Sequence, residues 1–144
     1  MILAAGLSPA WQQILEFESV CVGSVNRARR ATWCASGKVL NVARALRQLE
    51  SPARTLCIAG GMPGDAIRRE FLRERIAAHW IDAGEATRIC TTILDRSTGA
   101  TTELVENAAP CDMSVFDEFE HAYKSAAQEC DFAVITGSLP PNAP

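Results

Sequence analysis

Apolar and polar positions follow two different rhythms along this chain. Mostly apolar runs at 2–7, 54–59 and 131–136 predict buried strands, because a strand that is covered on both faces has no polar side. Other segments place apolar residues at helical spacing with charged residues between them, which predicts amphipathic helices. These helical segments are residues 39–49, 66–79 and 113–128. Alternating buried strands and helices predict an α/β fold with a parallel sheet and helices on its faces.

The ends of the second and third helices carry local signals. Residues 60–65 are rich in glycine and predict a turn, with Asp65 as a cap for the helix that follows. Ser114 stands three residues before Asp117 and is the expected cap of the third helix. Residues 80–83 form a candidate short strand.

Two further strand pairs do not fit the alternation of strands and helices. Residues 14–20 and 25–33 alternate between apolar and polar side chains, as expected for half-exposed strands. Residues 88–95 and 100–105 flank the turn sequence Arg-Ser-Thr-Gly, a strong hairpin signal. We expect the two pairs to form a separate small sheet beside the main one.

Composition and charge narrow the class of protein. The chain has 144 residues, of which 48% are apolar and 22% charged, so one globular domain is expected. Its net charge of −3 gives no reason to expect a nucleic-acid partner. No apolar run reaches the roughly 20 residues that span a bilayer, and no signal peptide is apparent, so no membrane partner and a cytoplasmic location are expected. The six cysteines are scattered, lack metal-ligand spacing and are expected to be free thiols, most of them buried.

The clearest chemical signal is a glycine turn that runs into the first helix. Gly37 allows close approach of a ligand to the backbone, and the start of a helix attracts anions. Lys38 adds a positive charge, and Asn41 adds a donor and an acceptor one turn later. This arrangement favours a polar and phosphorylated small molecule.

Six motifs in order resemble the ribokinase-like carbohydrate kinases, specifically the phosphofructokinase-B branch with 1-phosphofructokinase and tagatose-6-phosphate kinase. Leu-Ser-Pro-Ala at 7–10 is similar to L-N-P-A, Val-Asn-Arg at 25–27 to V-N-R, and residues 36–44 to G-G-K-G-x-N-V-A-R. Ile-Ala-Gly-Gly at 58–61 with Gly64 and Asp65 is similar to G-G-x-x-G-D. Arg88 with Thr91 and Thr92 is similar to R-x-x-T, and Gly-Ser-Leu-Pro-Pro at 137–141 to S-G-S-L-P-P.

The resemblance implies a ribokinase-like parallel sheet flanked by helices, with a small β-sheet lid whose strands fall at approximately 13–33 and 88–105. It implies transfer of the γ-phosphate of ATP, with Mg²⁺, to a hydroxyl of a phosphorylated ketohexose such as fructose 1-phosphate, fructose 6-phosphate or tagatose 6-phosphate. By the same resemblance Gly37 and Asn41 contact sugar hydroxyls, Ser138 lies near them, and the substrate phosphate is held by Lys38, Arg27 and Arg88. Surface, hairpin-edge and capping roles are the structural alternatives for these side chains.

Two positions depart from the family pattern. Gln12 stands where the family has an Asp that holds a sugar hydroxyl, and it remains a candidate substrate-binding residue without the charge. Val39 stands where the family has Gly, and it would be strained if that position needs a positive φ.

The resemblance covers residues 1–144 as the N-terminal part of a kinase domain. The family's catalytic Asp, ATP pocket and Mg²⁺ segment would all lie beyond residue 144, so no catalytic, cofactor or metal residue is expected within the chain, and the chain alone is expected to be inactive. The alternative is a non-catalytic sugar-phosphate-binding or interaction module, with a homodimer through the lid. Half of a ribose or nucleoside kinase is favoured less, because Lys38 and the arginines suit a substrate that already carries phosphate.

Overall fold

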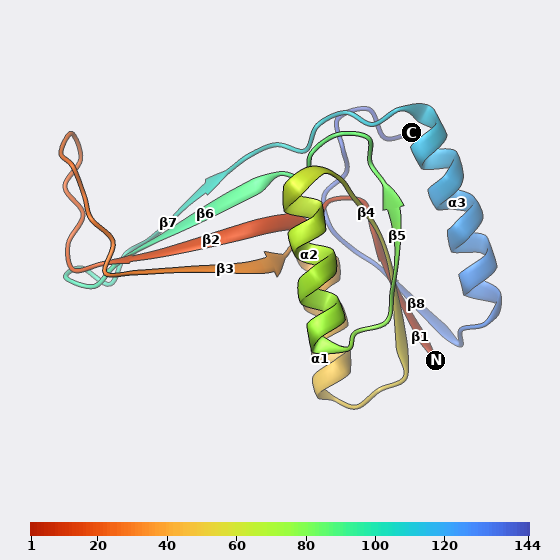
Figure 1. Cartoon of the computed structure of the whole chain (residues 1–144). Helices are drawn as coiled ribbons and strands as arrows, with labels where there is room; N and C mark the ends of the chain where they lie inside the picture. Colours follow the sequence, from red (N-terminus) through yellow and green to blue (C-terminus); the bar gives the residue numbers. More distant parts are fainter.

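The computed structural model describes residues 1–144 and contains two sheets and three helices (Figure 1). The strands are β1 (Ile2–Gly6), β2 (Ala10–Phe17), β3 (Arg30–Ser36), β4 (Ala53–Ala59), β5 (Ala78–Asp82), β6 (Ile89–Asp95), β7 (Thr101–Val105) and β8 (Phe132–Ile135). The helices are α1 (Lys38–Gln48), α2 (Gly61–Glu74) and α3 (Met113–Gln128). No helix is long and apolar enough to cross a membrane.

The first sheet, sheet A, is parallel throughout and has the strand order β5-β4-β1-β8. Its side chains alternate between two apolar cores. Leu3 and Ala5 of β1 pack on the side of α3, whereas Ala4 packs on the side of α1 and α2. The predicted parallel sheet with helices on both faces is therefore confirmed (Figure 1).

Strand β8 differs from the expectation that residues 131–136 form a buried strand. It pairs only with β1, and its outer edge is free. Phe132 and Ile135 are each 71% exposed. The expectation of burial was wrong for this chain, because an apolar run signals a covered strand but does not say which segment covers it.

The second sheet, sheet B, has the order β3-β2-β6-β7 and projects away from the helices (Figure 1). Antiparallel pairing joins β2 to β3 and β6 to β7, as predicted for the two strand pairs. The predicted limits of the first pair were wrong, because β2 begins and ends before 14–20 and β3 begins and ends after 25–33. A parallel pairing of β2 with β6 joins the two pairs into one sheet. The separate small sheet is thus confirmed.

The predicted limits of α2 were wrong by about a turn at each end. Gly60 precedes the helix, and the glycine-rich segment forms its first turn, where the missing N–H of Pro63 costs no hydrogen bond. Asp65 therefore lies inside α2 and forms a salt bridge with Arg68 at 3.0 Å instead of capping the helix. The helix ends at Glu74 and is followed by the cap residue Arg75, whose φ of 55° is left-handed, and then by β5.

Two smaller predictions, on the cap of α3 and on the burial of the cysteines, were also wrong in part. Asp112, not Ser114, precedes α3, and Ser114 lies within that helix. All six cysteines are free, but only Cys57, Cys90 and Cys111 are buried.

Candidate functional site

Most of the residues singled out from the sequence line one cleft of about 260 Å³, named here the Gly37 cleft. It lies where the start of α1, the turn after β1, the loop after β8 and one face of sheet B meet. Six of the seven predicted site residues line it: Gln12, Gly37, Lys38, Asn41, Arg88 and Ser138. The cleft therefore gathers side chains that are more than 120 positions apart in the sequence.

Gly37 shapes the floor of the cleft. It precedes α1 with a φ of 103°, a conformation that side-chain-bearing residues rarely adopt. A Cβ at this position would lie 3.0 Å from the Pro9 Cα and 3.1 Å from the Ser8 carbonyl oxygen. The glycine thus lets the turn after β1 pack directly on the start of the helix.

The first turn of α1 supplies the positive end of the cleft. Lys38 and Asn41 are exposed, and Lys38 forms no salt bridge within the chain. The first N–H groups of a helix have no acceptor within it and carry a partial positive charge. An anion in the cleft would meet the Lys38 ammonium and these N–H groups together.

Arg88 is held in place by main-chain carbonyl groups. Its Nε donates to the Pro9 oxygen at 3.3 Å, Nη1 to the Glu106 oxygen at 3.3 Å, and Nη2 to the Ser8 oxygen at 3.4 Å. These bonds use only part of its donor set, because Nη1 and Nη2 each carry a second N–H. The anchored guanidinium can therefore still donate to a ligand.

Gln12 lies on the cleft face of sheet B. Its Nε2 donates to the Thr92 Oγ1 at 2.7 Å. This bond fixes the orientation of the amide and leaves Oε1 as an acceptor. A hydroxyl group of a ligand could donate to this oxygen, but no carboxylate charge accompanies it.

Val39 is not strained, because its position does not need the positive φ on which the expected strain depends. It lies inside α1, and the only non-glycine residues with positive φ are Glu50 and Arg75. Its side chain is 1% exposed and faces Gly6, where an added Cβ would lie 2.9 Å from the Val39 Cβ. Val39 thus fills core space beneath the cleft.

Arg27 is the predicted site residue that does not line the cleft. It is exposed in the segment between β2 and β3, which lies at the end of sheet B farthest from the helices (Figure 1). Asn26 fixes this segment by accepting from the Cys21 N–H and donating to the Cys21 oxygen, both at 2.8 Å. The motif that contains Arg27 therefore shapes a loop here.

Six further lining residues were not singled out as site residues, although Ser8, Ala10 and Ser36 stand within the recognised motifs. These are Ser8, Ala10, Ser36, Cys90, Glu103 and Val105. Strand register places Cys90 beside Gln12 and Glu103 beside Thr92. The parallel pairing of β2 with β6 sets this register, and no local sequence pattern shows it.

The residues present do not fit a Mg²⁺–ATP site. No group of three or more His, Cys, Asp or Glu side chains could hold a metal ion. Glu103 is the single carboxylate among the residues of the Gly37 cleft, whereas Mg²⁺ is held by carboxylates together with phosphates and water. No step of phosphoryl transfer can be assigned to these side chains.

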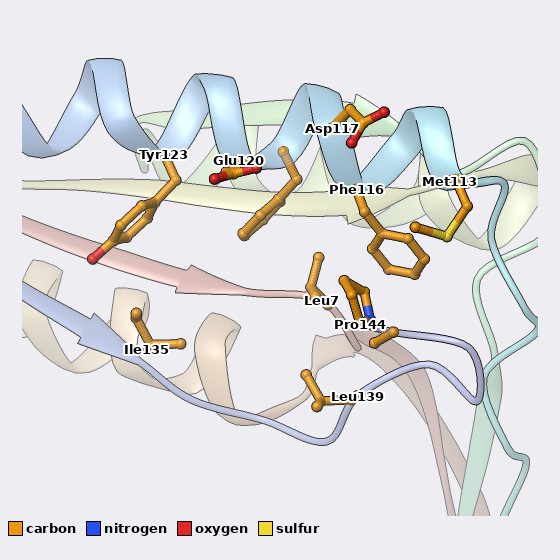
Figure 2. Close-up of a pocket in the computed structure, with 11 residues that line it drawn as sticks. Leu7, Met113, Phe116, Asp117, Glu120, Tyr123, Ile135, Leu139 and Pro144 are labelled. Atoms are coloured by element: carbon orange, nitrogen blue, oxygen red, sulfur yellow. The ribbon is translucent and has the colours of Figure 1, made fainter.

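A second cleft, of about 440 Å³, lies between α3 and the C-terminal segment and is named here the α3 cleft (Figure 2). Phe116 and Tyr123 of α3 face Leu7, Ile135 and Leu139 across it (Figure 2). Its lining is mainly apolar, with no basic side chain among its residues. The α3 cleft is therefore unsuited to a sugar phosphate.

Known proteins that resemble this chain along nearly its whole length are named as sugar-phosphate kinases. A tagatose-6-phosphate kinase from Staphylococcus epidermidis is 29% identical over 140 residues. The fold resembles that of a "possible 1-phosphofructokinase" from Thermotoga maritima, with a TM-score of 0.93 at 24% identity over the whole chain. It also resembles phosphofructokinase-2 from Escherichia coli, solved with fructose 6-phosphate, with a TM-score of 0.87 at 22% identity over the whole chain.

The chain spans less than half of each of these proteins. It covers 44% of the curated tagatose-6-phosphate kinase and 47% and 48% of the two solved structures. The model of the pfkB family carbohydrate kinases matches residues 11–144. This match takes in nearly all of the chain: every helix, every strand except β1 and the first residue of β2, and every residue that lines the Gly37 cleft except Ser8 and Ala10. The chain belongs to the pfkB family of carbohydrate kinases.

Proposed function

We propose that this chain forms the sugar-phosphate side of a kinase that transfers phosphate from ATP to a hydroxyl of a phosphorylated ketohexose. Fructose 1-phosphate, fructose 6-phosphate and tagatose 6-phosphate are the candidate substrates. The observation that carries the proposal is the convergence of Gly37, Lys38, Asn41, Arg88, Ser138 and Gln12 on one cleft. A curated relative named as a tagatose-6-phosphate kinase supports it.

The charges of the cleft favour a phosphorylated sugar over a neutral one. Lys38 and Arg88 lie on the same cleft as the start of α1, so three positive groups meet there. Glu103 is the one opposing charge, and it is exposed on β7. Gln12 and Asn41 supply amide groups that suit sugar hydroxyls.

The 144 residues alone are proposed to bind substrate without transferring phosphate. The poor fit of the cleft to Mg²⁺–ATP supports this, as does the coverage of only 44% of the curated relative. Phosphoryl transfer depends on metal ions and positioned charges around the transferred group. ATP and Mg²⁺ are therefore assigned to the complete kinase.

Sheet B is the proposed contact of a homodimer. Trp33 on β3 and Leu104 on β7 share one face by strand register and are 42% and 55% exposed. All five residues of the edge strand β7 are exposed. A structure of Escherichia coli phosphofructokinase-2 is described as a tetrameric inhibited form, so assembly occurs in a protein of this fold.

A non-catalytic sugar-phosphate-binding module is the second candidate. It is favoured by the finding that six expected binding residues already converge within these 144 residues. An ADP-release assay with the three sugar phosphates separates the candidates for any longer form of the protein. Turnover supports the kinase, and binding without turnover supports the module.

Calorimetric titration of the 144-residue chain tests the proposal directly. Fructose 6-phosphate should bind, and fructose should bind at least about tenfold more weakly. Lys38→Ala should reduce the affinity for fructose 6-phosphate by about tenfold, which corresponds to about 1.4 kcal/mol of binding free energy. Lys124→Ala is the matched control, because Lys124 is exposed on α3 and pairs with Glu120 outside the cleft. Equal affinity for fructose and fructose 6-phosphate, or an unchanged affinity in Lys38→Ala, would contradict the proposal.

A further inference from the structure

Ser8 carries a buried hydroxyl group without a hydrogen-bond partner. The residue lies in the turn between β1 and β2 and is 3% exposed. Its Oγ is the single buried side-chain polar atom of the chain that no other group satisfies. An unpaired buried hydroxyl costs free energy, so such a group in a folded protein calls for an explanation.

The rest of the fold satisfies comparable groups. Thr87 is also buried, and its Oγ1 accepts the Gly60 N–H at 3.0 Å. Gln12 and Thr92 pair with each other beneath the cleft. The unsatisfied Ser8 hydroxyl is therefore an exception within a well-paired chain.

Ser8 lies at the positive part of the Gly37 cleft. It lines the cleft together with Lys38 and Arg88. Its carbonyl oxygen accepts from the Arg88 Nη2 at 3.4 Å and would lie 3.1 Å from a Cβ at position 37. The main chain of Ser8 is thus held between the guanidinium and the start of α1, which fixes the residue at the border of the cleft.

We propose that the Ser8 hydroxyl donates a hydrogen bond to a phosphate oxygen of the sugar phosphate in the Gly37 cleft. The inference rests on the proposed function and adds a binding residue to it. A phosphate oxygen is the suitable acceptor because Arg88 and Lys38 draw negative charge to the same part of the cleft. The bond would satisfy the hydroxyl only when ligand is bound.

A structural water molecule is the competing explanation. Ser8 also lines a small cavity of about 30 Å³, which is enough for one water. A water that bridged Ser8 to its surroundings would stabilise the free protein. The two explanations therefore differ in what removal of the hydroxyl does without ligand.

The test compares the 144-residue chain with Ser8→Ala in two measurements. Urea unfolding without ligand should give an unchanged or higher midpoint for Ser8→Ala, because an unpaired hydroxyl is removed. Titration should show affinity for fructose 6-phosphate and for inorganic phosphate reduced by about tenfold, the effect expected for a hydrogen bond to a charged group. Thr87→Val is the stability control and should lower the midpoint, and Ser125→Ala, exposed on α3, should change neither quantity.

Each result decides the proposal. Unchanged affinity of Ser8→Ala for fructose 6-phosphate or inorganic phosphate overturns the role of Ser8 and leaves the proposed function standing. A loss of stability comparable with that of Thr87→Val assigns the hydroxyl to the fold and also overturns it. Absence of fructose 6-phosphate binding by the unmodified chain overturns the proposed function and this inference together.

Discussion

Arg44 of α1 and Glu70 of α2 form an ion pair that also holds both main-chain groups of Ala35 in β3. Glu70 Oε2 accepts the Ala35 N–H at 3.1 Å, and Arg44 Nη1 donates to the Ala35 oxygen. Arg44 also pairs with Glu74 at 2.9 Å. The pair thus fixes the end of β3 just before Gly37 and links sheet B to α1 and α2.

Replacing Arg44 with Met should destabilise the chain by about 3 kcal/mol, because it leaves the buried Glu70 carboxylate unpaired. Glu70→Gln should cost less, about 1 kcal/mol, since its amide oxygen can still accept the Ala35 N–H. Urea unfolding measures both. Arg54→Ala is the matched control, because Arg54 and Glu129 form a half-exposed pair worth less than about 1 kcal/mol. Equal losses in Arg44→Met and Arg54→Ala would show that the buried pair has no special role.

Gly37→Ala should lower both stability and sugar-phosphate affinity. The φ of 103° and the contacts of 3.0 and 3.1 Å to Pro9 and Ser8 combine strain with crowding, so a loss of about 2 kcal/mol is expected. Gly84→Ala is the control: its φ is 72°, but an added Cβ meets nothing within 4 Å. It should cost about 1 kcal/mol and leave affinity unchanged. Thermal unfolding and calorimetric titration of both variants check this. An unchanged sugar-phosphate affinity in Gly37→Ala would argue against the Gly37 cleft as the binding site.

Asp95 makes the tip of sheet B sensitive to acid. Hydrogen bonds to its carboxylate lower the pKa of Asp95 to about 2. The largest contribution comes from the Val20 N–H, followed by the Ser97 hydroxyl and the N–H groups of Thr98 and Ser97. A depressed pKa in the folded state stabilises the fold above the ordinary value of 3.8, and this contribution is lost as the pH falls from about 4 to about 2. A carboxyl NMR titration should therefore place Asp95 near 2, and Asp95→Asn should remove this part of the acid dependence. Titration near 3.8 would mean that these bonds do not form in solution.

The free edge of β8 should promote association of the isolated chain. Phe132 and Ile135 are each 71% exposed beside an unpaired strand edge, and Ile135 also borders the α3 cleft (Figure 2). Phe132→Ser combined with Ile135→Thr should reduce self-association at high concentration in sedimentation velocity. Leu49→Ser is the control, because Leu49 is 72% exposed at the end of α1, away from β8. Similar effects of the two changes would point to general surface hydrophobicity instead.

Local patterns were enough to predict most elements of the fold. The helical spacing at 113–128 matches α3 at both ends, and the hairpin signal around Arg96 matches β6 and β7. The start of α2 was missed, because glycine and proline signal a turn but are also compatible with the first turn of a helix. The exposure of β8 does not follow from its apolar run, because exposure depends on which segments lie beside the strand in space.

The site was predictable where the ligand-binding signal is local and not where it depends on register. Gly37, Lys38 and Asn41 stand together in the sequence and line one cleft. Glu103 reaches the cleft only through the pairing of β6 with β7. Ser8 lay within a recognised motif, but its unsatisfied hydroxyl depends on burial, which the sequence does not show.

The most direct test of the account is to map sugar-phosphate binding on the chain by amide NMR. Titration with fructose 6-phosphate should shift the amide signals of Gly37, Lys38, Asn41, Arg88 and Ser138, because these residues line one cleft. Signals of Tyr123 and Phe119 in the α3 cleft should stay in place. Shifts confined to the α3 cleft, or no shifts at saturating sugar phosphate, would contradict the assignment of the Gly37 cleft as a sugar-phosphate site.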